Sequence, residues 1–422
     1  MSQQQSGGTT AAIVGARPPL LRPFAALRPL PEFAPQVAAR PYDVVSFSEA
    51  KAGAAGKPES FLHVSRAEID LPDGTDPHAP AVYERAAAAL AAMTTAGVLV
   101  RETTPCYYVY RMTAGDHVQT GVAAAGSVAA YRENRIRRHE HTRPDKELDR
   151  TRQIEAVGAH TGPVLTVHGP DAGLARLFAA VAKDDEPIAD AVTDEGTRHQ
   201  VWRIADPQAI ADVSGRFAAM PAIWIADGHH RSAAAARVAA ARGEADARFL
   251  LVSFPTDEVR ILDYNRVVRD LNGHDAAGFR AAVGERFSVT PAAGAFRPER
   301  PGVFGMRLAD AWYRLEVRNP PDLAGSPVER LDVSLLSDRL LAPILGVTDP
   351  RTDPRIDFVG GGRGLGALDE RVASGWAVAF ALHPTQLEEL IAVADAGLVM
   401  PPKSTWFEPK LADGLLSLPL VD

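Results

Sequence analysis

Between residues 163 and 268, short apolar runs alternate with alanine-rich segments of helical length. The apolar runs are rich in β-branched and aromatic residues, which favour strands: PVLTVHG, HQVWRIA, AIWIA and FLLVSFP. The segments between them have the composition of helices: AGLARLFAAVA, PQAIADVSGRFAA and SAAAARVAAARG. Strands that alternate with helices in this way predict an α/β architecture.

Similar patterns are found on both sides of this stretch. Upstream, VYERAAAALAAMTTAG predicts a helix that ends at Gly97, and CYYVYRM and HVQTGVAAAGSV predict a hairpin. Downstream of the Asn272-Gly273 turn we expect a second set of strands and helices, including a helix through WAVAFAL. The pattern predicts three parts: a disordered tail over residues 1–20, a region over 21–272 and a C-terminal α/β domain over 273–422.

Composition narrows the class of protein. The chain has 422 residues, a net charge of -8 and a pI near 5.9, which argues against a general nucleic-acid binder because such proteins need a basic face. Cys106 is the only cysteine, which excludes an internal disulfide and favours a reducing compartment. The start, MSQQQSGGTT, does not resemble a secretory signal, and no apolar run reaches the roughly 18 residues of a membrane helix. We therefore expect a cytoplasmic protein without a membrane or nucleic-acid partner.

A sharp strand-to-helix turn, IADGHHRS, lies at residues 225–232. The first turn of a helix offers unpaired N–H groups and a partial positive charge, which favour anions. Gly228 allows close approach of a ligand. His229, His230 and Arg231 add donors suited to phosphate oxygens. Asp227 could cap the helix, hold a histidine or bind a metal; the alternative for the whole turn is a capped junction with solvated polar residues.

A dense charged block, RIRRHEHTRPDKELDR, occupies residues 135–150. Pro144 is expected to begin a helix. One interpretation is a polyanion pocket in which Glu140 is the base. The other is a solvated helix whose charges pair with one another, which is the usual meaning of such runs. On the first interpretation, the block supplies four candidate substrate ligands: His139, Thr142, Arg143 and Lys146.

Two more segments carry candidate residues. The tail PPKSTWFEPK holds Lys403, Ser404 and Thr405, followed by Lys410. An ammonium and two hydroxyls can bind a phosphate, although the tail lacks the Gly-rich loop of a P-loop; it could equally be a capping segment packed by its aromatic residues. Near the N-terminus, polar residues stand in apolar surroundings: Asp43, His63, Arg66 and Glu68. A histidine in such surroundings is more often part of the core than a catalyst.

Eight of these segments occur together in one family. They are RPFAALRP, ARPYDVVS, SFLHVSRAEIDLP, IRRHEHTRPDKELDR, TGPV, IADGHHRSAAA, ILDYNRVV and MPPKSTWFEPK. In this order they resemble domain-of-unknown-function family 1015, a set of bacterial and archaeal proteins of about this length. The resemblance covers the chain from about residue 22 to 415. That family has no assigned activity. The resemblance therefore implies that the chain is a member of the family but does not imply which reaction it catalyses.

The strand–DGHHR–helix unit is also similar to the phosphate-binding box of the ParB/sulfiredoxin superfamily, which includes nucleotide hydrolases, sulfiredoxin and kinases of free serine. This similarity implies a nucleotide-binding catalytic core over residues 21–272, with phosphates held by Gly228, His229, His230 and Arg231. The carboxylate motif of those kinases does not align here, which leaves Glu140, Glu68 and Asp43 as candidate bases. Sulfiredoxin has a cysteine in this box where the present chain has histidine, so reduction of sulfinic acids is not expected.

Three functional hypotheses follow. The preferred one is a nucleotide-dependent kinase of a small hydroxylated metabolite, with free serine as the leading candidate and ATP or ADP as donor. Mg²⁺ would be held by Asp227, and Glu140, Asp227 and His230 would be catalytic. Arg22 or Arg143 would bind the acceptor's carboxylate. A phosphatase or nucleotide hydrolase with the same pocket is the second hypothesis, and a nucleotide-sensing protein without turnover is the third. The sequence also leaves open whether the protein forms a homodimer.

Overall fold

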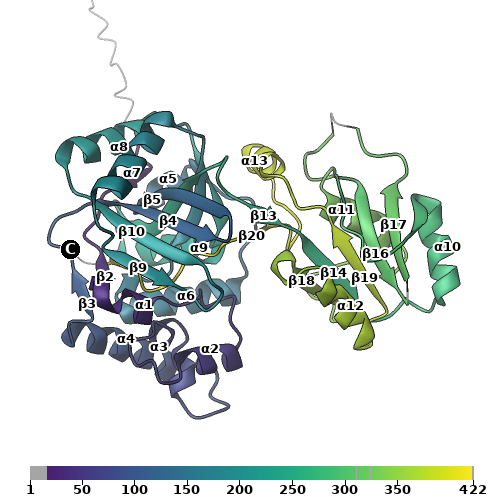
Figure 1. Ribbon diagram of the computed structural model, residues 1–422, viewed down its shortest axis with the longest axis horizontal. Helices are drawn as coiled ribbons and strands as arrows, with labels where there is room; N and C mark the ends of the chain where they lie inside the picture. The colour runs from purple at the N-terminus through teal and green to yellow at the C-terminus, as the bar shows by residue number, and fades with distance from the viewer. Residues whose placement is uncertain (1–16, 310, 323–324, 421–422) are drawn as a thin grey trace, which may run out of the picture.

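The computed structural model describes residues 17–309, 311–322 and 325–420, and its chain forms two lobes that lie side by side (Figure 1). Both lobes combine sheets with helices, so the predicted mixed α/β class is confirmed. Most of the predicted disordered tail, residues 1–16, lies outside the described residues. The prediction is wrong for the end of that tail, because Leu20 is buried in the core.

The first lobe is built on a nine-stranded mixed sheet with the order β6-β11-β8-β12-β5-β4-β10-β9 and with β1 beside β5. Its strands are β1 (Leu21–Arg22), β4 (Tyr107–Ala114), β5 (His117–Ser127), β6 (Ile136–Arg137), β8 (Val164–His168), β9 (Ala189–Val192), β10 (Arg198–Ile204), β11 (Ile223–Asp227) and β12 (Arg248–Pro255). Strands β4 and β5 form the predicted hairpin, in which Ala114 is opposite His117.

Both faces of this sheet are buried. Successive side chains of a strand point to opposite faces, so Tyr107 and Val109 of β4 enter one core while Tyr108 and Tyr110 enter another. The first core is covered by helices: α5 (Val128–Arg132), α7 (Ala172–Asp184), α8 (Pro207–Ala219) and α9 (His229–Arg242). This arrangement explains why CYYVYRM carries apolar residues at consecutive positions instead of alternating ones.

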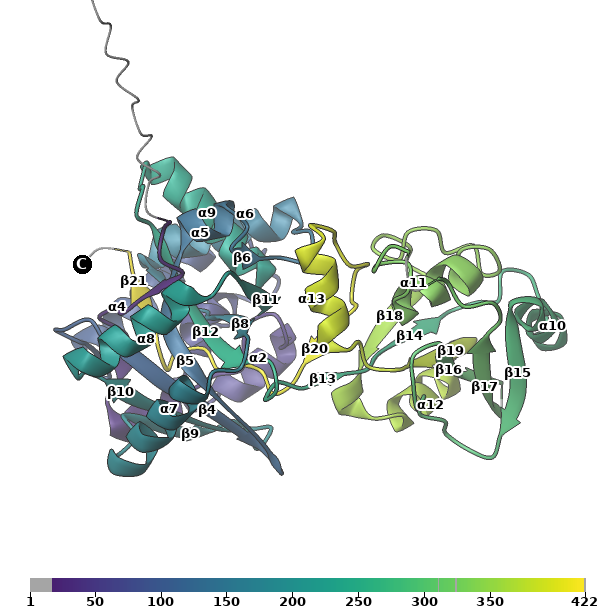
Figure 2. The ribbon, with the colours of Figure 1, turned by 90° about the horizontal axis from the view of Figure 1, so that it is seen from above.

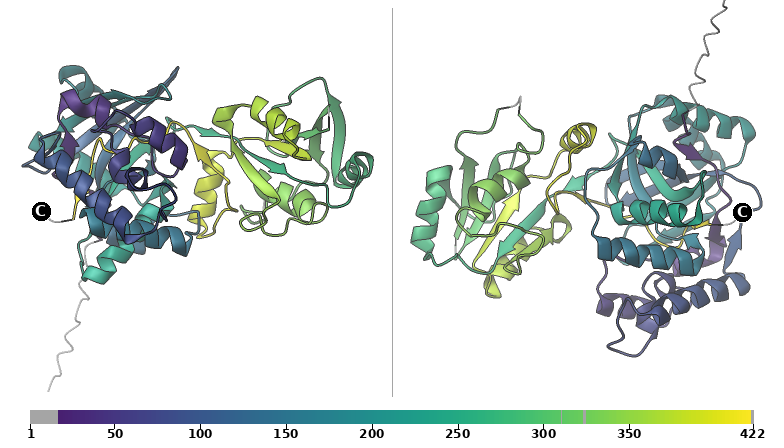
Figure 3. Two further views of the ribbon diagram at one scale, coloured as in Figure 1. Left: turned by 90° about the horizontal axis from the view of Figure 1, so that it is seen from below. Right: turned by 180° about the vertical axis from the view of Figure 1, so that it is seen from behind.

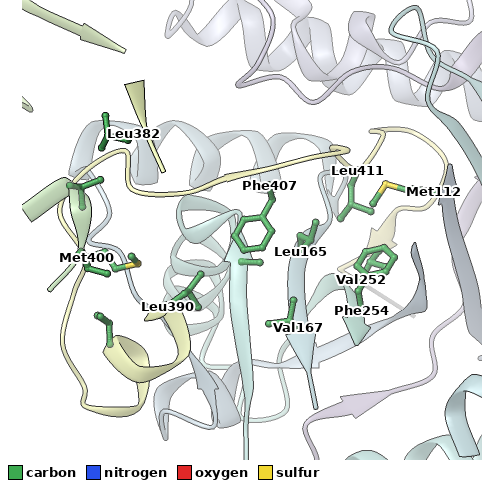
Figure 4. Packing of buried hydrophobic residues seen from close by; sticks show 14 of the residues in the cluster. Met112, Leu165, Val167, Val252, Phe254, Leu382, Leu390, Met400, Phe407 and Leu411 are labelled. Carbon is green, nitrogen blue, oxygen red and sulfur yellow. The ribbon is translucent and has the colours of Figure 1, made fainter. Parts of the chain in front are cut away.

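The C-terminal tail covers the other face of the sheet. Phe407 and Leu411 pack with Leu165, Val252 and neighbouring strand residues in one cluster (Figure 4). The tail leaves the second lobe and ends in the first (Figure 3). On its way β20 (Trp406–Phe407) pairs with β13 (Ile261–Leu262), and β21 (Leu418–Pro419) pairs with β7 (Ala159–His160). The predicted domain over residues 273–422 therefore needs a correction, because its last residues belong to the first lobe.

A helical layer from the N-terminal part completes the first lobe. It contains η1 (Pro31–Phe33), α1 (Ala34–Val37), α2 (Phe47–Ala54), α3 (Leu62–Ser65), η2 (Ala67–Asp70) and α4 (Pro80–Thr95), with a small ladder of β2 (Leu27–Pro29) and β3 (Leu99–Arg101). Helix α6 (Pro144–Val157) packs against both α4 and α9. It begins at Pro144, as the sequence predicts, and Arg143 is its N-cap residue.

The second lobe has a six-stranded antiparallel sheet with the order β15-β17-β16-β19-β14-β18. Its elements are β14 (Tyr264–Val268), α10 (Ala276–Arg286), β15 (Phe287–Ala292), β16 (Val303–Leu308), β17 (Ala311–Val317), α11 (Asp332–Leu336), the π-helical turn η3 (Ser337–Leu341), β18 (Ile356–Gly360), η4 (Gly361–Arg363), α12 (Gly366–Ala373), β19 (Val378–Leu382) and α13 (Leu387–Asp395). Since β14 belongs to this sheet, the chain crosses between lobes near Asp263, before the predicted boundary at residue 272.

One predicted helix is wrong. WAVAFAL forms strand β19, which lies between β16 and β14 in the middle of the second sheet. All five residues of the strand are buried. A short, continuously apolar run fits a buried helix and a central strand equally well, so periodicity could not decide between them.

Helix α13 lies between the two lobes (Figure 2). Asp395, the last residue of this helix, accepts hydrogen bonds from Trp224 Nε1 at 2.6 Å and from Arg137 Nη1. The N–H of Met400 donates to the carbonyl of His139 at 2.8 Å. These contacts join the second lobe to β11, to β6 and to the loop that leads into α6. No helix within the described residues is long and apolar enough to cross a membrane.

Candidate functional site

The turn between β11 and α9 depends on Gly228. This residue is the N-cap of α9 and has a φ of 94°, in the left-handed region that favours glycine. A Cβ atom at this position would lie 3.0 Å from Arg231 Nε and 3.1 Å from Arg231 Cζ. Glycine is therefore required both by the backbone conformation and by the guanidinium that packs on it.

The first turn of α9 has no side-chain cap. The N–H groups of Arg231 and Ser232 donate to the carbonyl of Gly228. The N–H groups of His229 and His230 come before these first helical bonds, where a helix has unpaired donors and a partial positive charge. The predicted helix N-terminus is thus present, with Gly228 at the expected place.

Arg231 lies in a narrow slot behind this turn and is 8% exposed. Its Nη1 donates to the carbonyl of Pro163, and a Cβ on Gly162 would lie 3.2 Å from Arg231 Cδ. Its Nη2 lies 3.4 Å from Asp227 Oδ2 and 3.6 Å from Asp43 Oδ2. Burial alone would lower the pKa of Arg231, but Asp43 and Asp227 raise it above its usual value. The arginine is therefore held charged and in one place.

One lysine of the tail reaches the same site, and a second contacts the neighbouring lobe. Lys410 Nζ lies 3.4 Å from Asp227 Oδ2 and 5.0 Å from the centre of the Trp406 ring. Lys403 Nζ lies 5.7 Å from the centre of the Tyr264 ring, which belongs to the second lobe. Burial would lower the pKa of Lys403, but Tyr264 and nearby carboxylates raise it. Lys410 thus joins Arg231 beside one turn, and Lys403 interacts electrostatically with Glu140 and Asp43.

Asp227 stays ionised between these cations. Burial would raise its pKa, but Lys410, Arg231 and His229 hold it well below the usual range. Within the described residues there is no group of three or more His, Cys, Asp or Glu side chains that could hold a metal ion by itself. The expected magnesium ion would also contact the phosphates of the nucleotide, so the role of Asp227 as one of its ligands stays a prediction.

Glu140 faces the site from the loop before α6. Its Oε2 lies 3.7 Å from His229 Nδ1, and the side chain is 39% exposed. Burial raises the pKa of Glu140 and Asp227 raises it further, while Lys403 and Lys410 oppose this. The carboxylate of the charged block is therefore close to the α9 turn, as the interpretation of that block as a pocket requires.

The histidines are placed differently from the prediction. His229 Nε2 accepts a hydrogen bond from the backbone N–H of His139 at 3.4 Å, and His230 Nε2 accepts one from the N–H of Arg143 at 3.0 Å. Burial lowers the pKa of both rings. The prediction that both rings bind phosphate needs correction for their Nε2 atoms, because these atoms hold a loop that lies about 90 residues away along the chain.

His139 is buried beside His229, with ring centres 4.5 Å apart and ring planes at 83°. Its two ring nitrogens have no hydrogen-bond partner among the described residues. Burial lowers its pKa to about 4. The ring therefore packs as a neutral aromatic group beneath the site, and its predicted contact with a substrate would require it to move.

Other candidates of the charged block and tail form contacts of their own. Thr142 Oγ1 donates to Glu147 at 3.1 Å, and Arg143 Nη2 pairs with Asp145 at 2.7 Å. Ser404 is buried and donates to the carbonyl of Pro401 at 2.5 Å. Lys146 and Thr405 are half-buried. Roles for these residues in binding phosphate or substrate stay predictions.

Three candidates are not brought to the α9 turn. Arg22 pairs with Asp246, which follows the far end of α9, about 20 Å from its first turn. His63 Nδ1 contacts Asp70 at 2.9 Å in the N-terminal helical layer. Glu68 is buried and pairs with Arg66 at 2.6 Å. These groups have local structural partners, which their polar character in apolar surroundings did not reveal.

Sequence reasoning missed a cavity of about 30 Å³ beside Arg231, lined in part by Tyr42, Arg150, Gly162 and Asp413. Asp413 is 2% exposed, and its Oδ1 has no hydrogen-bond partner in the described part of the chain. Burial raises the pKa of Asp413 to about 7. Tyr42 adjoins Asp43 and could have been suspected, whereas Asp413 comes from the returning tail and had no signal in the sequence.

Among solved structures, three similar chains can be named. A free serine kinase in complex with AMP is 14% identical, with 70% of this chain and 91% of that chain covered and a TM-score of 0.37. SbnI with a C-terminal truncation, from Staphylococcus aureus, is 14% identical, with 71% and 87% covered and a TM-score of 0.38. A conserved hypothetical protein from Pyrococcus furiosus is 13% identical, with 70% and 94% covered and a TM-score of 0.36. A likeness this distant assigns neither substrate nor reaction.

Sequence comparison is more specific. No curated protein matches the chain. The model of the family described as "Protein of unknown function (DUF1015)" matches residues 21–334, which include the charged block and the α9 turn. This match spans most of the sequence and confirms the family inferred from its motifs. The chain belongs to the DUF1015 family of proteins of unknown function.

Proposed function

We propose that this protein is a nucleotide-dependent kinase that phosphorylates a small hydroxylated metabolite. One observation carries the proposal: cations from two separate segments, Arg231 and Lys410, lie beside an uncapped helix N-terminus that a half-buried carboxylate, Glu140, also faces. Such an arrangement offers charge neutralisation and positioning, which are most of what phosphoryl transfer needs.

In this proposal the terminal phosphate of the nucleotide lies on the first turn of α9. The N–H groups of His229 and His230 would donate to its oxygens, and Arg231 and Lys410 would neutralise its charge. The long contacts of Asp227 with both cations, at 3.4 Å each, allow them to turn toward a phosphate without a large rearrangement. Lys403 would approach from the side of the second lobe.

Glu140 would be the general base. Its raised pKa brings it closer to neutral pH, where a carboxylate accepts a proton more effectively. The acceptor hydroxyl would lose its proton to Glu140, its oxygen would form the new O–P bond, and the bridging oxygen of the donor would leave with the electron pair. Free serine is the leading acceptor because the similarity to the ParB/sulfiredoxin superfamily implies it.

A phosphorus NMR assay tests this proposal. The protein would be incubated with MgCl₂, ATP or ADP, and a pool of hydroxylated amino acids and sugars. We expect a new phosphomonoester signal with matching loss of nucleotide. Glu140→Gln should slow its appearance by about a hundredfold or more, whereas Glu133→Gln, at an exposed position at the end of α5, should have no effect.

Other outcomes select the alternatives. Inorganic phosphate without a phosphomonoester would establish a hydrolase that uses the same pocket and would overturn the kinase. An unchanged spectrum together with calorimetric binding of the nucleotide would indicate a sensor without turnover. An unchanged spectrum without binding would overturn the phosphate site itself.

A further inference from the structure

The two consecutive histidines of α9 contact one loop at two points. The loop runs from Arg138 to Arg143 and joins β6 to α6. His229 Nε2 accepts from the N–H of His139 at 3.4 Å, and His230 Nε2 accepts from the N–H of Arg143 at 3.0 Å. Glu140 lies between these two contacts, so its backbone is fixed on both sides by the first turn of α9.

These contacts define the state of the rings. A backbone N–H can only donate, so each Nε2 must be an unprotonated acceptor. In a neutral imidazole the proton then sits on Nδ1, and the Nδ1 of His229 lies 3.7 Å from Glu140 Oε2. His229 thus holds the loop with one ring nitrogen and faces its carboxylate with the other.

The ends of the loop are also fixed. The carbonyl of His139 accepts from the N–H of Met400, in the segment that follows α13, and the ring of His139 packs edge-on against His229. On the other side, Thr142 Oγ1 donates to Glu147 in the first turn of α6. The histidine contacts are therefore part of a continuous set of bonds that leaves Glu140 little freedom.

We propose that His229 and His230 are positioning residues, whose imidazoles clamp the loop 138–143 so that Glu140 faces the first turn of α9, and that the rings do not bind phosphate. The importance of Glu140 rests on the proposed kinase function, but the clamp itself does not. A small displacement of a catalytic group can cost about a hundredfold in rate, so holding this loop is sufficient reason for two adjacent histidines.

Amide hydrogen exchange on the ligand-free full-length protein tests the clamp without reference to activity. His230→Ala should raise the exchange rate of the Arg143 amide by about fivefold, because one hydrogen bond is lost, and His229→Ala should do the same for His139. His230→Gln should restore protection, since a glutamine side-chain oxygen can accept from the same N–H. The control is His274→Ala, at an exposed position of the second lobe. Unchanged exchange in both alanine variants would overturn the clamp.

The ring states give a second readout that is independent of stability. Nitrogen-15 NMR at neutral pH should show unprotonated Nε2 and protonated Nδ1 atoms for both residues. The Nε2–H tautomer in either ring would contradict the assigned contacts.

Kinetics separate the clamp from a phosphate contact. His230→Ala should lower kcat by about tenfold to a hundredfold with the Kd of ADP changed less than about twofold, and His230→Gln should recover most of kcat. A raised Kd with unchanged exchange would show that the ring binds phosphate and would overturn the inference. If the protein proves not to be a kinase, the exchange and NMR results still decide the clamp, so the two proposals can fail separately.

Discussion

Most ion pairs in the second lobe are 3.0 Å or shorter, whereas those of Arg231 and Lys410 at the first turn of α9 are longer. In the second lobe Arg307 Nε lies 2.7 Å from Asp369, and Arg355 Nη2 lies 2.8 Å from Asp353. At the site Arg231 Nη2 lies 3.4 Å from Asp227 and 3.6 Å from Asp43, and Lys410 Nζ lies 3.4 Å from Asp227. The same residue types thus form two kinds of pair in one chain.

The difference in distance indicates which charged groups are already satisfied by a partner within the protein. A short pair on the surface satisfies both partners and adds little to stability. The pairs at the site are more buried on the cation side, since Arg231 is almost fully covered, yet they lack close hydrogen bonds between the charged groups. Catalytic contacts are often long without substrate and tighten when it binds. We infer that the charges of the second lobe satisfy one another, and those of the α9 turn serve a ligand.

The largest difference in nucleotide binding is expected when one arginine of the site and one arginine of the second lobe are replaced in turn. Arg231→Ala should weaken ADP binding by about tenfold to a hundredfold, because charge-assisted hydrogen bonds to phosphate are lost. Arg355→Ala should leave the Kd unchanged. Calorimetric titration measures both. If Arg231→Ala fails to fold, Arg231→Met keeps more of the buried volume; equal affinities in the folded variants would remove the distinction between the lobes.

The buried carboxyl of Asp413 should make the stability of the first lobe depend on pH. Burial raises its pKa to about 7, so the folded protein binds a proton there that the unfolded chain releases near pH 4. The stability that the protonated carboxyl contributes is complete below pH 4 and is lost as pH rises through 7. As pH rises from 5 to 8, the free energy of unfolding of Asp413→Asn should therefore increase by about 2 kcal/mol relative to that of wild type. Urea unfolding at each pH measures this difference. The exposed Asp349→Asn of the second lobe should show no such gain, and parallel curves for Asp413→Asn and wild type would contradict the burial argument.

The two glycines that flank α9 offer a matched pair within one helix. Gly228 and Gly243 both have positive φ, of 94° and 66°, but a Cβ would contact Arg231 only at Gly228 and would meet nothing within 4 Å at Gly243. Alanine should cost about 1–2 kcal/mol of stability at either position through backbone strain. Only Gly228→Ala should also weaken ADP binding, by about tenfold. Similar binding losses in both variants would point to general loosening of the helix.

The smallest effect on stability and binding is expected at a short ion pair of the second lobe. Asp369→Asn keeps an acceptor for Arg307 Nε and Trp312 Nε1 while it removes the charge. The free energy of unfolding, measured by thermal denaturation, should change by less than about 1 kcal/mol. The Kd of ADP should not change. A loss of binding here would mean that the second lobe's charges reach the site, and the comparison would fail.

Local features of the site could be predicted from the sequence. The strand, the glycine and the helix of IADGHHRS are set by neighbours within a few residues, and so is the start of α6 at Pro144. Residue types alone suggest that Glu140 approaches this turn, and the structure brings the two together.

Features that depend on distant pairing could not be predicted. The histidines had the chemistry of ligand donors, but their Nε2 atoms accept from a loop that no local pattern places beside them. The return of the tail, which brings Lys410 to Asp227, depends on packing against the sheet. The strand β19 has a composition that also suits a buried helix, and only its neighbours in the sheet decide its form.

The most direct test of the central claim is a crystal structure of the protein with ADP. We predict that the terminal phosphate lies within hydrogen-bonding distance of the N–H groups of His229 and His230, with Arg231 or Lys410 turned toward it. Glu140 should remain on the same side, with its loop still bound to the two imidazoles. ADP bound elsewhere on the chain, with the pairs of Asp227 unchanged, would contradict the assignment of the α9 turn as the phosphate site.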